Sequence, residues 1–525
     1  MTFFPWQTNC TLAFKRGVSW LSILTLSLAT LLSWPTAVLA REATPAATDL
    51  QPYLDQVAAK VSEFTLANGM KFIVLERPQA PVVSFMLYAD VGAVNEADGE
   101  TGVAHYLEHL AFKGTQQIGT TDYPAEQALL DEMDAVFQQL LAAEQAGQTA
   151  EAAMLRSQLD RLRQEAAAYV EQNKYGQIIE QAGGVGLNAT TGADATRYFY
   201  SLPANKLELW MSLESERFLE PVFREFYEEK EVILEERRMR VDNSPIGKFI
   251  EVFLEAAFDQ HPYRRPIIGY QEDLYVATRE AVTRFFDAYY GPNNLIGVIV
   301  GDVDAAAVER MAAAYFGRYN ARSLPAEVTL QEPPQTAPKE FSLELPSQPW
   351  YLEGYHRPSI NDPDHVIYGM IESILVGGRT SRFYKDLVEG QQIALDIGSI
   401  NGFPGDKYPN MLVLYGITAP GVVPDAIGTA IHQQLEQLKT EPVAASELER
   451  VKTQARAGLL RQLDSNSGMA ALLAEYEAKT GSWRNLFTQL EEIEAVTPAD
   501  IQRVAQATFR PENRTVGKLL SANGA

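Results

Sequence analysis

Cysteine is almost absent from the sequence. The single cysteine among 525 residues is Cys10, and it lies in a segment that we expect to be removed. A mature chain without cysteine forms no disulfide bond and loses no thiol in an oxidising compartment. The same absence excludes a cysteine nucleophile and cysteine metal ligands from the mature protein.

Basic residues are also scarce relative to acidic ones. Lys and Arg number 44 against 68 Asp and Glu, which gives a formal net charge of −24. Residues 1–40 contain Lys15, Arg16 and no acidic residue, so removing their +2 from −24 leaves −26. Such a surface repels nucleic acid and anionic lipid, and we expect neither as a partner. It favours basic or neutral peptide-like partners, although solubility alone explains it equally well.

Long apolar runs are absent except near the N-terminus. There GVSWLSILTLSLATLLSW follows a positively charged stretch and precedes PTAVLA, in which Val38 and Ala40 suit the −3 and −1 positions of a cleavage site. We therefore expect residues 1–40 to be a signal peptide, and the mature chain to be periplasmic or extracellular without stable membrane insertion. The alternative is an uncleaved N-terminal anchor, but Pro35 interrupts a run already near the lower limit for a span.

The length of the chain predicts more than one domain, because a single hydrophobic core stops growing near ~250–300 residues. From about residue 60, strand patterns alternate with helical patterns, and this order partly repeats after a Pro-rich polar stretch. These features predict an α+β protein with two similar domains. We expect a linker at 41–59, a first domain at 60–325, a second linker at 326–340 and a second domain at 341–525.

A segment at about 124–175 has the pattern of an inserted helical hairpin. Two runs of apolar residues follow coiled-coil spacing on either side of the polar stretch AAEQAGQTA. This pattern predicts two antiparallel helices that pair with each other. The hairpin is either a surface addition or an element that binds a partner or covers the site.

Histidine is scarce, yet two of the six histidines lie close together. GVAHYLEHLAF predicts a helix on which His105 and His109 share one face with Glu108 beside them. Two imidazoles suit a catalytic zinc ion, which takes three protein ligands and leaves a position for water. Glu108 suits the role of general base. Such a motif also occurs by chance on solvated helix faces, so the surrounding sequence decides between the two interpretations.

The surrounding sequence resembles the inverzincin metallopeptidases of family M16, which include pitrilysin, insulin-degrading enzyme and the mitochondrial processing peptidase. The resemblance covers most of residues 60–520. HYLEHLAFKGT resembles the family's zinc helix and the loop after it, and EEKEVILEE resembles the second zinc helix. GLNATTGADATRYFY resembles the substrate-pairing strand, and HPYRRPIIGYQEDL and YYGPNNLIGVIVGDVD resemble further family landmarks.

The resemblance implies a secreted zinc endopeptidase with two homologous domains, each a mainly antiparallel sheet packed by helices. It implies that His105, His109 and Glu236 ligate Zn²⁺ and that Glu108 is the general base. Glu229 would be a carboxylate that orients a ligand. Its alternative is a solvent-facing partner of Lys230 or Arg237, and Glu235 competes with Glu236 for the ligand role.

The resemblance also implies that Asn188 and Ala189 lie on the edge strand that binds substrate, where an extended peptide adds to the sheet. Asn188 is alternatively a plain strand-end residue. Backbone pairing of this kind reads conformation more than sequence and suits peptides or unfolded segments as substrates.

One departure from the family pattern concerns partners. Family members carry an arginine and, seven residues later, a tyrosine in the C-terminal half, where this chain has Val388 and Leu395. We therefore expect a partner subunit of similar fold that supplies the pair, in a heterodimer, with a homodimer as the weaker alternative. Two other hypotheses are a non-catalytic peptide-binding scaffold subunit and a zinc storage protein.

Overall fold

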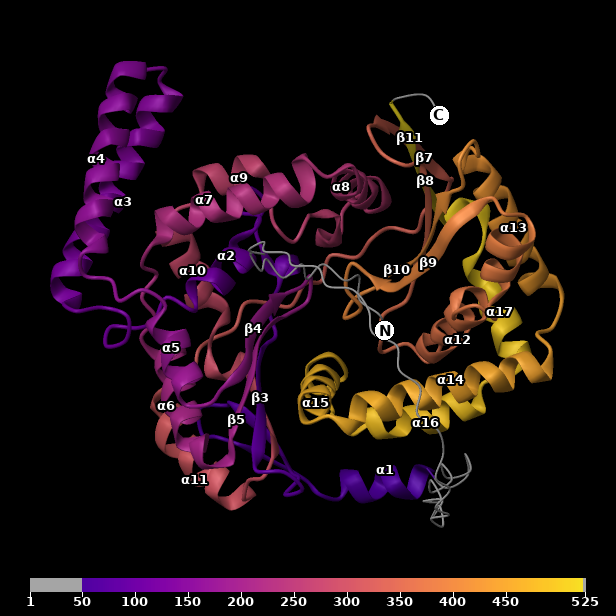
Figure 1. Ribbon diagram of the computed structural model, residues 1–525, viewed down its shortest axis with the longest axis horizontal. Helices are drawn as coiled ribbons and strands as arrows, with labels where there is room; N and C mark the ends of the chain where they lie inside the picture. The colour runs from indigo at the N-terminus through magenta and orange to yellow at the C-terminus, as the bar shows by residue number, and fades with distance from the viewer. Residues whose placement is uncertain (1–49, 523–525) are drawn as a thin grey trace, which may run out of the picture. The chain divides into compact units, whose positions relative to one another are not determined.

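The computed structural model describes residues 50–522, and Figure 1 shows their arrangement. The predicted signal peptide at 1–40 lies outside the described residues. Two β-sheets packed by helices confirm the predicted α+β class. No helix within residues 50–522 combines the length and the apolar character that a membrane span requires.

The two sheets repeat one topology. The first has the order β1-β2-β6-β3-β5-β4 and the second the order β7-β11-β8-β10-β9. If β1 is set aside, corresponding strands come in the same chain order, and β2–β6 and β7–β11 are the parallel pairs in otherwise antiparallel sheets. The duplicated order predicted from the sequence is therefore present. The strands are β1 Val61–Thr65, β2 Lys71–Glu76, β3 Val82–Ala89, β4 Val185–Thr191, β5 Thr196–Pro203, β6 Leu295–Gly301, β7 Lys339–Leu345, β8 Trp350–Arg357, β9 Ala394–Phe403, β10 Asn410–Thr418 and β11 Arg514–Ser521.

The central strands of the first sheet are apolar on both faces. In β2, Phe72 and Val74 face one core, whereas Ile73 and Leu75 face another. Successive residues of a strand point to opposite faces, so a continuous apolar run is expected only where both faces are covered. Helices α6 (Leu207–Leu219) and α11 (Ala305–Tyr315) cover the first face, and α15 (Asn466–Thr480) packs against β3 and β6 on the second.

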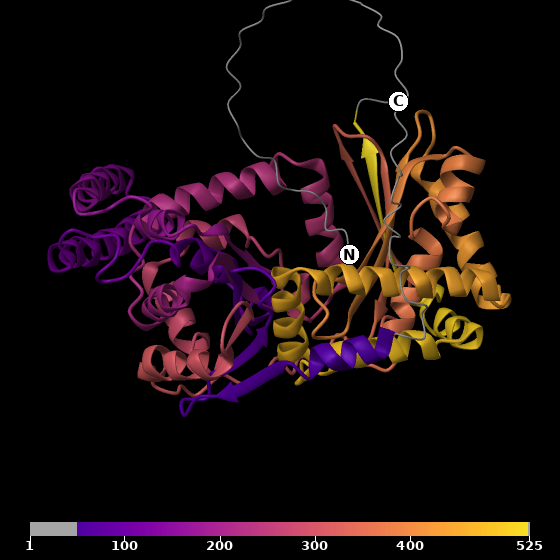
Figure 2. The same ribbon diagram turned by 60° about the horizontal axis from the view of Figure 1, so that its bottom comes forward.

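Each half of the chain provides a helix to the other half's sheet. Figures 1 and 2 show α15, from the C-terminal part, beside the first sheet. In return α8 (Pro245–Ala257) places Phe249 and Phe253 against the second sheet. Gly354 of β8 and Gly517 of β11 make room, because a Cβ at either would come within 2.8 Å of one of these rings. The predicted boundaries at 325 and 340 remain predictions, and the packing crosses them in both directions.

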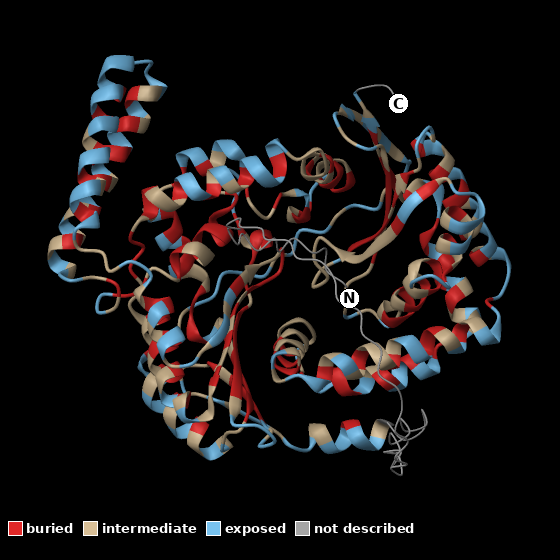
Figure 3. Cartoon of the chain, in the orientation of Figure 1, coloured by how far each residue is buried: buried red, intermediate tan, exposed pale blue. Residues whose placement is uncertain are grey.

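The predicted hairpin consists of α3 (Tyr123–Gln145) and α4 (Thr149–Ala167), which project from the first half. Figure 3 shows buried residues along their shared face and exposed residues outside. Its base is tied to the body by ion pairs. Arg224 binds the fully buried Glu126 at 2.8 Å, and Arg163 binds Glu228 and Glu231 at 2.8 Å.

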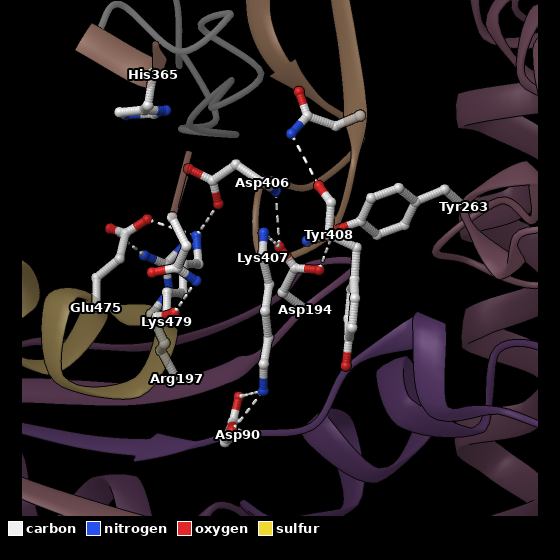
Figure 4. A network of polar contacts seen from close by, with 12 residues as sticks. Asp90, Asp194, Arg197, Tyr263, His365, Asp406, Lys407, Tyr408, Glu475 and Lys479 are labelled. Carbon is white, nitrogen blue, oxygen red and sulfur yellow. Dashed lines mark hydrogen bonds and ion pairs between the residues drawn. The ribbon is translucent and has the colours of Figure 1, made fainter. Parts of the chain in front are cut away.

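A polar network joins the β9–β10 loop to the first half of the chain (Figure 4). Asp194, in the turn between β4 and β5, accepts hydrogen bonds from the Tyr263 hydroxyl at 2.5 Å and from the backbone N–H groups of Asp406 and Lys407 at 2.8 and 3.1 Å. The Lys407 ammonium binds Asp90, which follows β3, at 2.6 Å. This loop is therefore fixed beside the end of the first sheet.

Replacing Asp194 by Ala leaves three donors without their carboxylate at a site where this side chain is buried, with 5% of it exposed. We expect the free energy of unfolding to fall by about 2–4 kcal/mol, because buried unpaired donors keep their full desolvation cost. Urea titration measures it. Asp98→Ala, at a side chain that is 94% exposed, is the control. Equal stability of the two variants would contradict the role of the network.

Candidate metal centre and active site

The histidines lie on α2 (Val103–Leu110), a short helix whose N-terminus is held from outside. Its N-cap residue is Gly102, which has a φ of 84° and no capping side chain. The buried carboxylate of Glu96 substitutes for a cap by accepting from the backbone N–H groups of Gly102 at 2.9 Å and Ala104 at 2.8 Å. Burial raises the pKa of Glu96 to about 8, although both donors favour its charged form. An eight-residue helix is marginal alone, so such contacts determine its position.

Helix α7 (Phe226–Arg237) packs against α2 and brings the other carboxylates to it. The Tyr106 ring stacks on that of Phe226, with centroids 4.6 Å apart, and its hydroxyl donates to the Phe226 carbonyl. Ile233 is fully buried on the same side. Glu229 and Glu236 are seven residues apart, which keeps them on one face of the helix.

Three predicted ligands meet between these helices. Glu236 Oε2 lies 3.7 Å from His105 Nε2 and 3.4 Å from His109 Nε2. One donor atom from each of the three side chains lies within 4.8 Å of the others. Within residues 50–522 this is the one group of three or more His, Cys, Asp or Glu side chains arranged in that way.

This donor set fits a zinc ion. Tetrahedral ligands at ~2.0–2.2 Å from zinc lie about 3.3–3.5 Å apart, close to the separations of Glu236 from the imidazoles. Two imidazoles and one carboxylate are three ligands that zinc accepts, and they leave a fourth position open. Glu235, the competing candidate, instead pairs with Arg238 at 2.5 Å on the exposed side of the helix.

The protonation of the three side chains reflects their crowding. Burial and the neighbouring His109 lower the pKa of His105 to about 4. Burial would also lower the pKa of His109, but Glu229 and Glu236 outweigh it and raise that pKa to about 9. Burial would raise the pKa of Glu236, but His109, His105 and Arg240 lower it to about 2. A ligating imidazole must be neutral, so a metal ion would compete with protonation of His109.

Glu108 lies at the same site, facing the end of β4. Burial raises its pKa, and the neighbouring Thr191 and His109 oppose that rise. A carboxylate with a raised pKa accepts a proton more readily than an ordinary glutamate does. Its position next to His109 on α2 therefore suits proton transfer at the metal position.

Glu229 forms no ion pair with Lys230 or Arg237, the two partners that the sequence offered as an alternative. Its Oε2 lies 3.1 Å from His109 Nδ1, and its Oε1 lies 2.5 Å from Lys113 Nζ. Glu229 therefore faces the ring nitrogen opposite the one that faces Glu236. Sequence reasoning missed Lys113 and the cap Glu96, although Lys113 lies within the motif HYLEHLAFKGT.

Asn188 and Ala189 lie on β4, which is an edge strand of the first sheet. Asn188 is exposed, and its side-chain oxygen accepts from the Ala189 N–H at 3.0 Å. Ala189 is buried and pairs with Tyr198 of β5. Val388 and Leu395, the positions considered for the arginine–tyrosine pair, are both apolar. Leu395 is 56% exposed on β9, and Val388 packs against the core of the second half.

Comparison with known proteins places this geometry in a family. The model described as Insulinase (Peptidase family M16) matches residues 71–149 and 159–271, and the model described as Peptidase M16 inactive domain matches residues 277–455. This chain belongs to peptidase family M16. The residues matched by the first model include His105, Glu108, His109, Glu229 and Glu236. The unmatched residues between its two segments, 150–158, lie in α4 of the helical hairpin.

Individual M16 relatives cover nearly the whole chain. The zinc protease PqqE of Helicobacter pylori is 27% identical over 465 residues, which are 87% of this chain and 92% of that protein. The crystal structure of a protease from Helicobacter pylori superposes with a TM-score of 0.74 at 25% identity, over 88% of this chain and 99% of that one. The first half of the periplasmic protease PqqL from Escherichia coli shares the fold, with a TM-score of 0.64 at 17% identity over 88% and 92% of the chains.

Replacing Glu96 by Ala leaves the N–H groups of Gly102 and Ala104 buried without an acceptor. We expect the free energy of unfolding to fall by about 2–4 kcal/mol, which thermal or urea unfolding would measure. Glu100→Ala removes a carboxylate from the same loop whose partner is the exposed Arg284, and it should cost less than about 0.5 kcal/mol. If Glu96→Ala lowered the free energy of unfolding no more than Glu100→Ala does, the Glu96 cap would contribute nothing to stability.

Proposed function

We propose that this chain is an exported zinc-dependent endopeptidase that hydrolyses peptides or unfolded polypeptide segments. The observation that carries the proposal is the meeting of His105, His109 and Glu236 with Glu108 beside them. Zinc protease is the name of the Helicobacter pylori relative, and the ligand geometry supports the same metal here. The expected location is the periplasm or the extracellular space, which rests on the N-terminal 40 residues of the sequence.

Each side chain has a specific role in this proposal. When bound, a zinc ion at the three ligands would polarise the scissile carbonyl and favour ionisation of a water molecule. Glu108 accepts the proton of the attacking water and passes it to the leaving amine. Glu229 accepts a hydrogen bond from His109 Nδ1 and so fixes the orientation of that ring.

The edge strand β4 is the proposed substrate-binding element. Its outer side has no neighbouring strand within the described sheet, and Asn188 is exposed on it. An extended peptide would add a strand next to Asn188 and Ala189 and run past Glu108. Thr191 at the end of β4 neighbours Glu108, which supports this path.

Replacement of Glu108 by Gln tests the chemistry. The variant should keep its zinc, because Glu108 is not one of the three ligands, while its kcat falls by at least about 10²–10⁴-fold, because general-base catalysis supplies that much. Zinc content by atomic spectroscopy and cleavage of a quenched fluorescent peptide are the two measurements. Glu235→Gln, on the exposed side of α7, is the matched control. Full activity in Glu108→Gln would refute the mechanism, and wild-type protein without zinc would refute the function.

The partner is a separate part of the proposal. Val388 and Leu395 hold no arginine–tyrosine pair, so we propose that a second M16-like chain supplies it in a heterodimer. Peptide cleavage should be slow with this chain alone and should rise at least about 10²-fold on adding the partner, because that pair grips the substrate during the reaction. Size-exclusion chromatography with light scattering would show the mixed species. A typical peptidase rate for the isolated chain would reject the requirement.

A further inference from the structure

Two cations flank the carboxylates of α7 in the same way. Glu236 directs Oε2 toward the imidazoles and Oε1 toward Arg240, at 2.8 Å. Glu229 likewise directs Oε2 toward His109 Nδ1 and Oε1 toward Lys113 Nζ, at 2.5 Å. In each case the oxygen that does not face a histidine is bound to a positive charge.

The two cations come from segments adjoining the two helices of the centre. Lys113 lies in the loop after α2, and it also binds Glu225 at 2.9 Å, the residue just before α7. Arg240 lies in η4 (Arg238–Asp242), one turn after Glu236. Each cation thus connects a carboxylate to the end of a helix that carries part of the centre.

A carboxylate has two equivalent oxygens and a side chain that rotates freely in water. Charge-assisted contacts at 2.5–2.8 Å favour one rotamer and hold one oxygen away from the histidines. A ligand already held in its bound orientation loses less entropy when the ion binds. The affinity for the metal therefore depends on the contacts that hold a ligating side chain, and not only on the ligating side chain itself.

We propose that Arg240 and Lys113 are positioning residues of the zinc centre: Arg240 fixes Glu236 so that one oxygen faces the two imidazoles, and Lys113 fixes Glu229 so that it orients His109. The inference rests on the proposed zinc function and extends it to two residues outside the ligand motif. Neither residue is placed on the substrate or on the reacting atoms.

The competing explanation is that Arg240 makes an ordinary surface ion pair, since its side chain is 58% exposed and such pairs contribute little. The chain offers a matched control for this. Arg238, two residues earlier in the same segment, is 60% exposed and binds Glu235 at 2.5 Å, away from the histidines. A generic loss of one surface arginine would affect both variants equally.

The first experiment compares R240Q with R238Q in the full chain, by competition for zinc with a chromophoric chelator. We expect R240Q to weaken zinc binding about tenfold and R238Q to change it less than twofold. R240K, which keeps a cation, should recover most of the affinity. Equal zinc affinity in R240Q and R238Q, or tighter binding in R240Q, would overturn the role of Arg240.

Peptide kinetics at saturating zinc give a second, independent readout. Because Arg240 acts through Glu236, the KM of R240Q should stay within twofold of the wild-type value once zinc is saturating. A raised KM together with unchanged zinc affinity would make Arg240 a substrate-binding residue and would overturn the inference.

Lys113 is tested in the same way with K113Q, and K174Q is the control because Lys174 pairs with Glu171 on the surface. Lys113 is more buried, with 21% of its side chain exposed, so we expect a larger effect than at Arg240, between about 10- and 100-fold in zinc affinity. If K113Q does not fold, K113R keeps the charge and should retain zinc within about tenfold. K113Q that folds and binds zinc as tightly as K174Q, or K113R that folds and loses more than about tenfold in zinc affinity, would contradict the proposal.

Failure of this inference is distinguishable from failure of the proposed function. A wild-type chain that binds no zinc would refute both. A wild-type chain that binds zinc and cleaves peptide, with R240Q and K113Q equal to their controls, would refute only the positioning role.

Discussion

The contact between α2 and α7 is the constraint on which the centre depends. The glutamate ligand is far from the two histidines along the chain. It meets them because Tyr106 of α2 stacks on Phe226 of α7 and its hydroxyl donates to the Phe226 carbonyl. The helical hairpin is inserted between α2 and α7 in the sequence, yet the two helices remain in contact. The Arg224–Glu126 pair and the backbone carbonyls that Arg224 binds hold the loop after α2 against the hairpin base. Insertion of α3 and α4 is therefore compatible with an undisturbed centre.

The two sheets depend on each other for burial. The first sheet has one face covered by α15, and the second has one face covered by α8, so each core is incomplete without a helix from the other half of the chain. Separating the halves would expose the apolar faces of both helices to water, which is unfavourable in proportion to the area exposed. The Asp194 network adds hydrogen bonds at the same junction. Both halves thus support the sheet that carries the proposed substrate strand β4.

The motif was predictable from the sequence, whereas its supports were not. His105, Glu108 and His109 share a helix face through their spacing alone. The seven-residue step selected Glu236, which lies beside the histidines, over Glu235, which pairs with Arg238. Glu96, Lys113 and Arg240 act through contacts between segments, which no local period reveals. The duplicated strand order was visible from the sequence, but the crossing of α8 and α15 was not, because an apolar helix face does not indicate which sheet it will cover. The hairpin followed from its coiled-coil spacing, which is a local signal.

The charges of the side chains around the centre also balance one another. Glu229 and Glu236 bring two negative charges beside His109, with Lys113 and Arg240 on their outer oxygens. Burial would lower the pKa of His109, but these two carboxylates raise it. In our proposal Lys113 and Arg240 orient these carboxylates before an ion binds, so that the site is not assembled from free side chains.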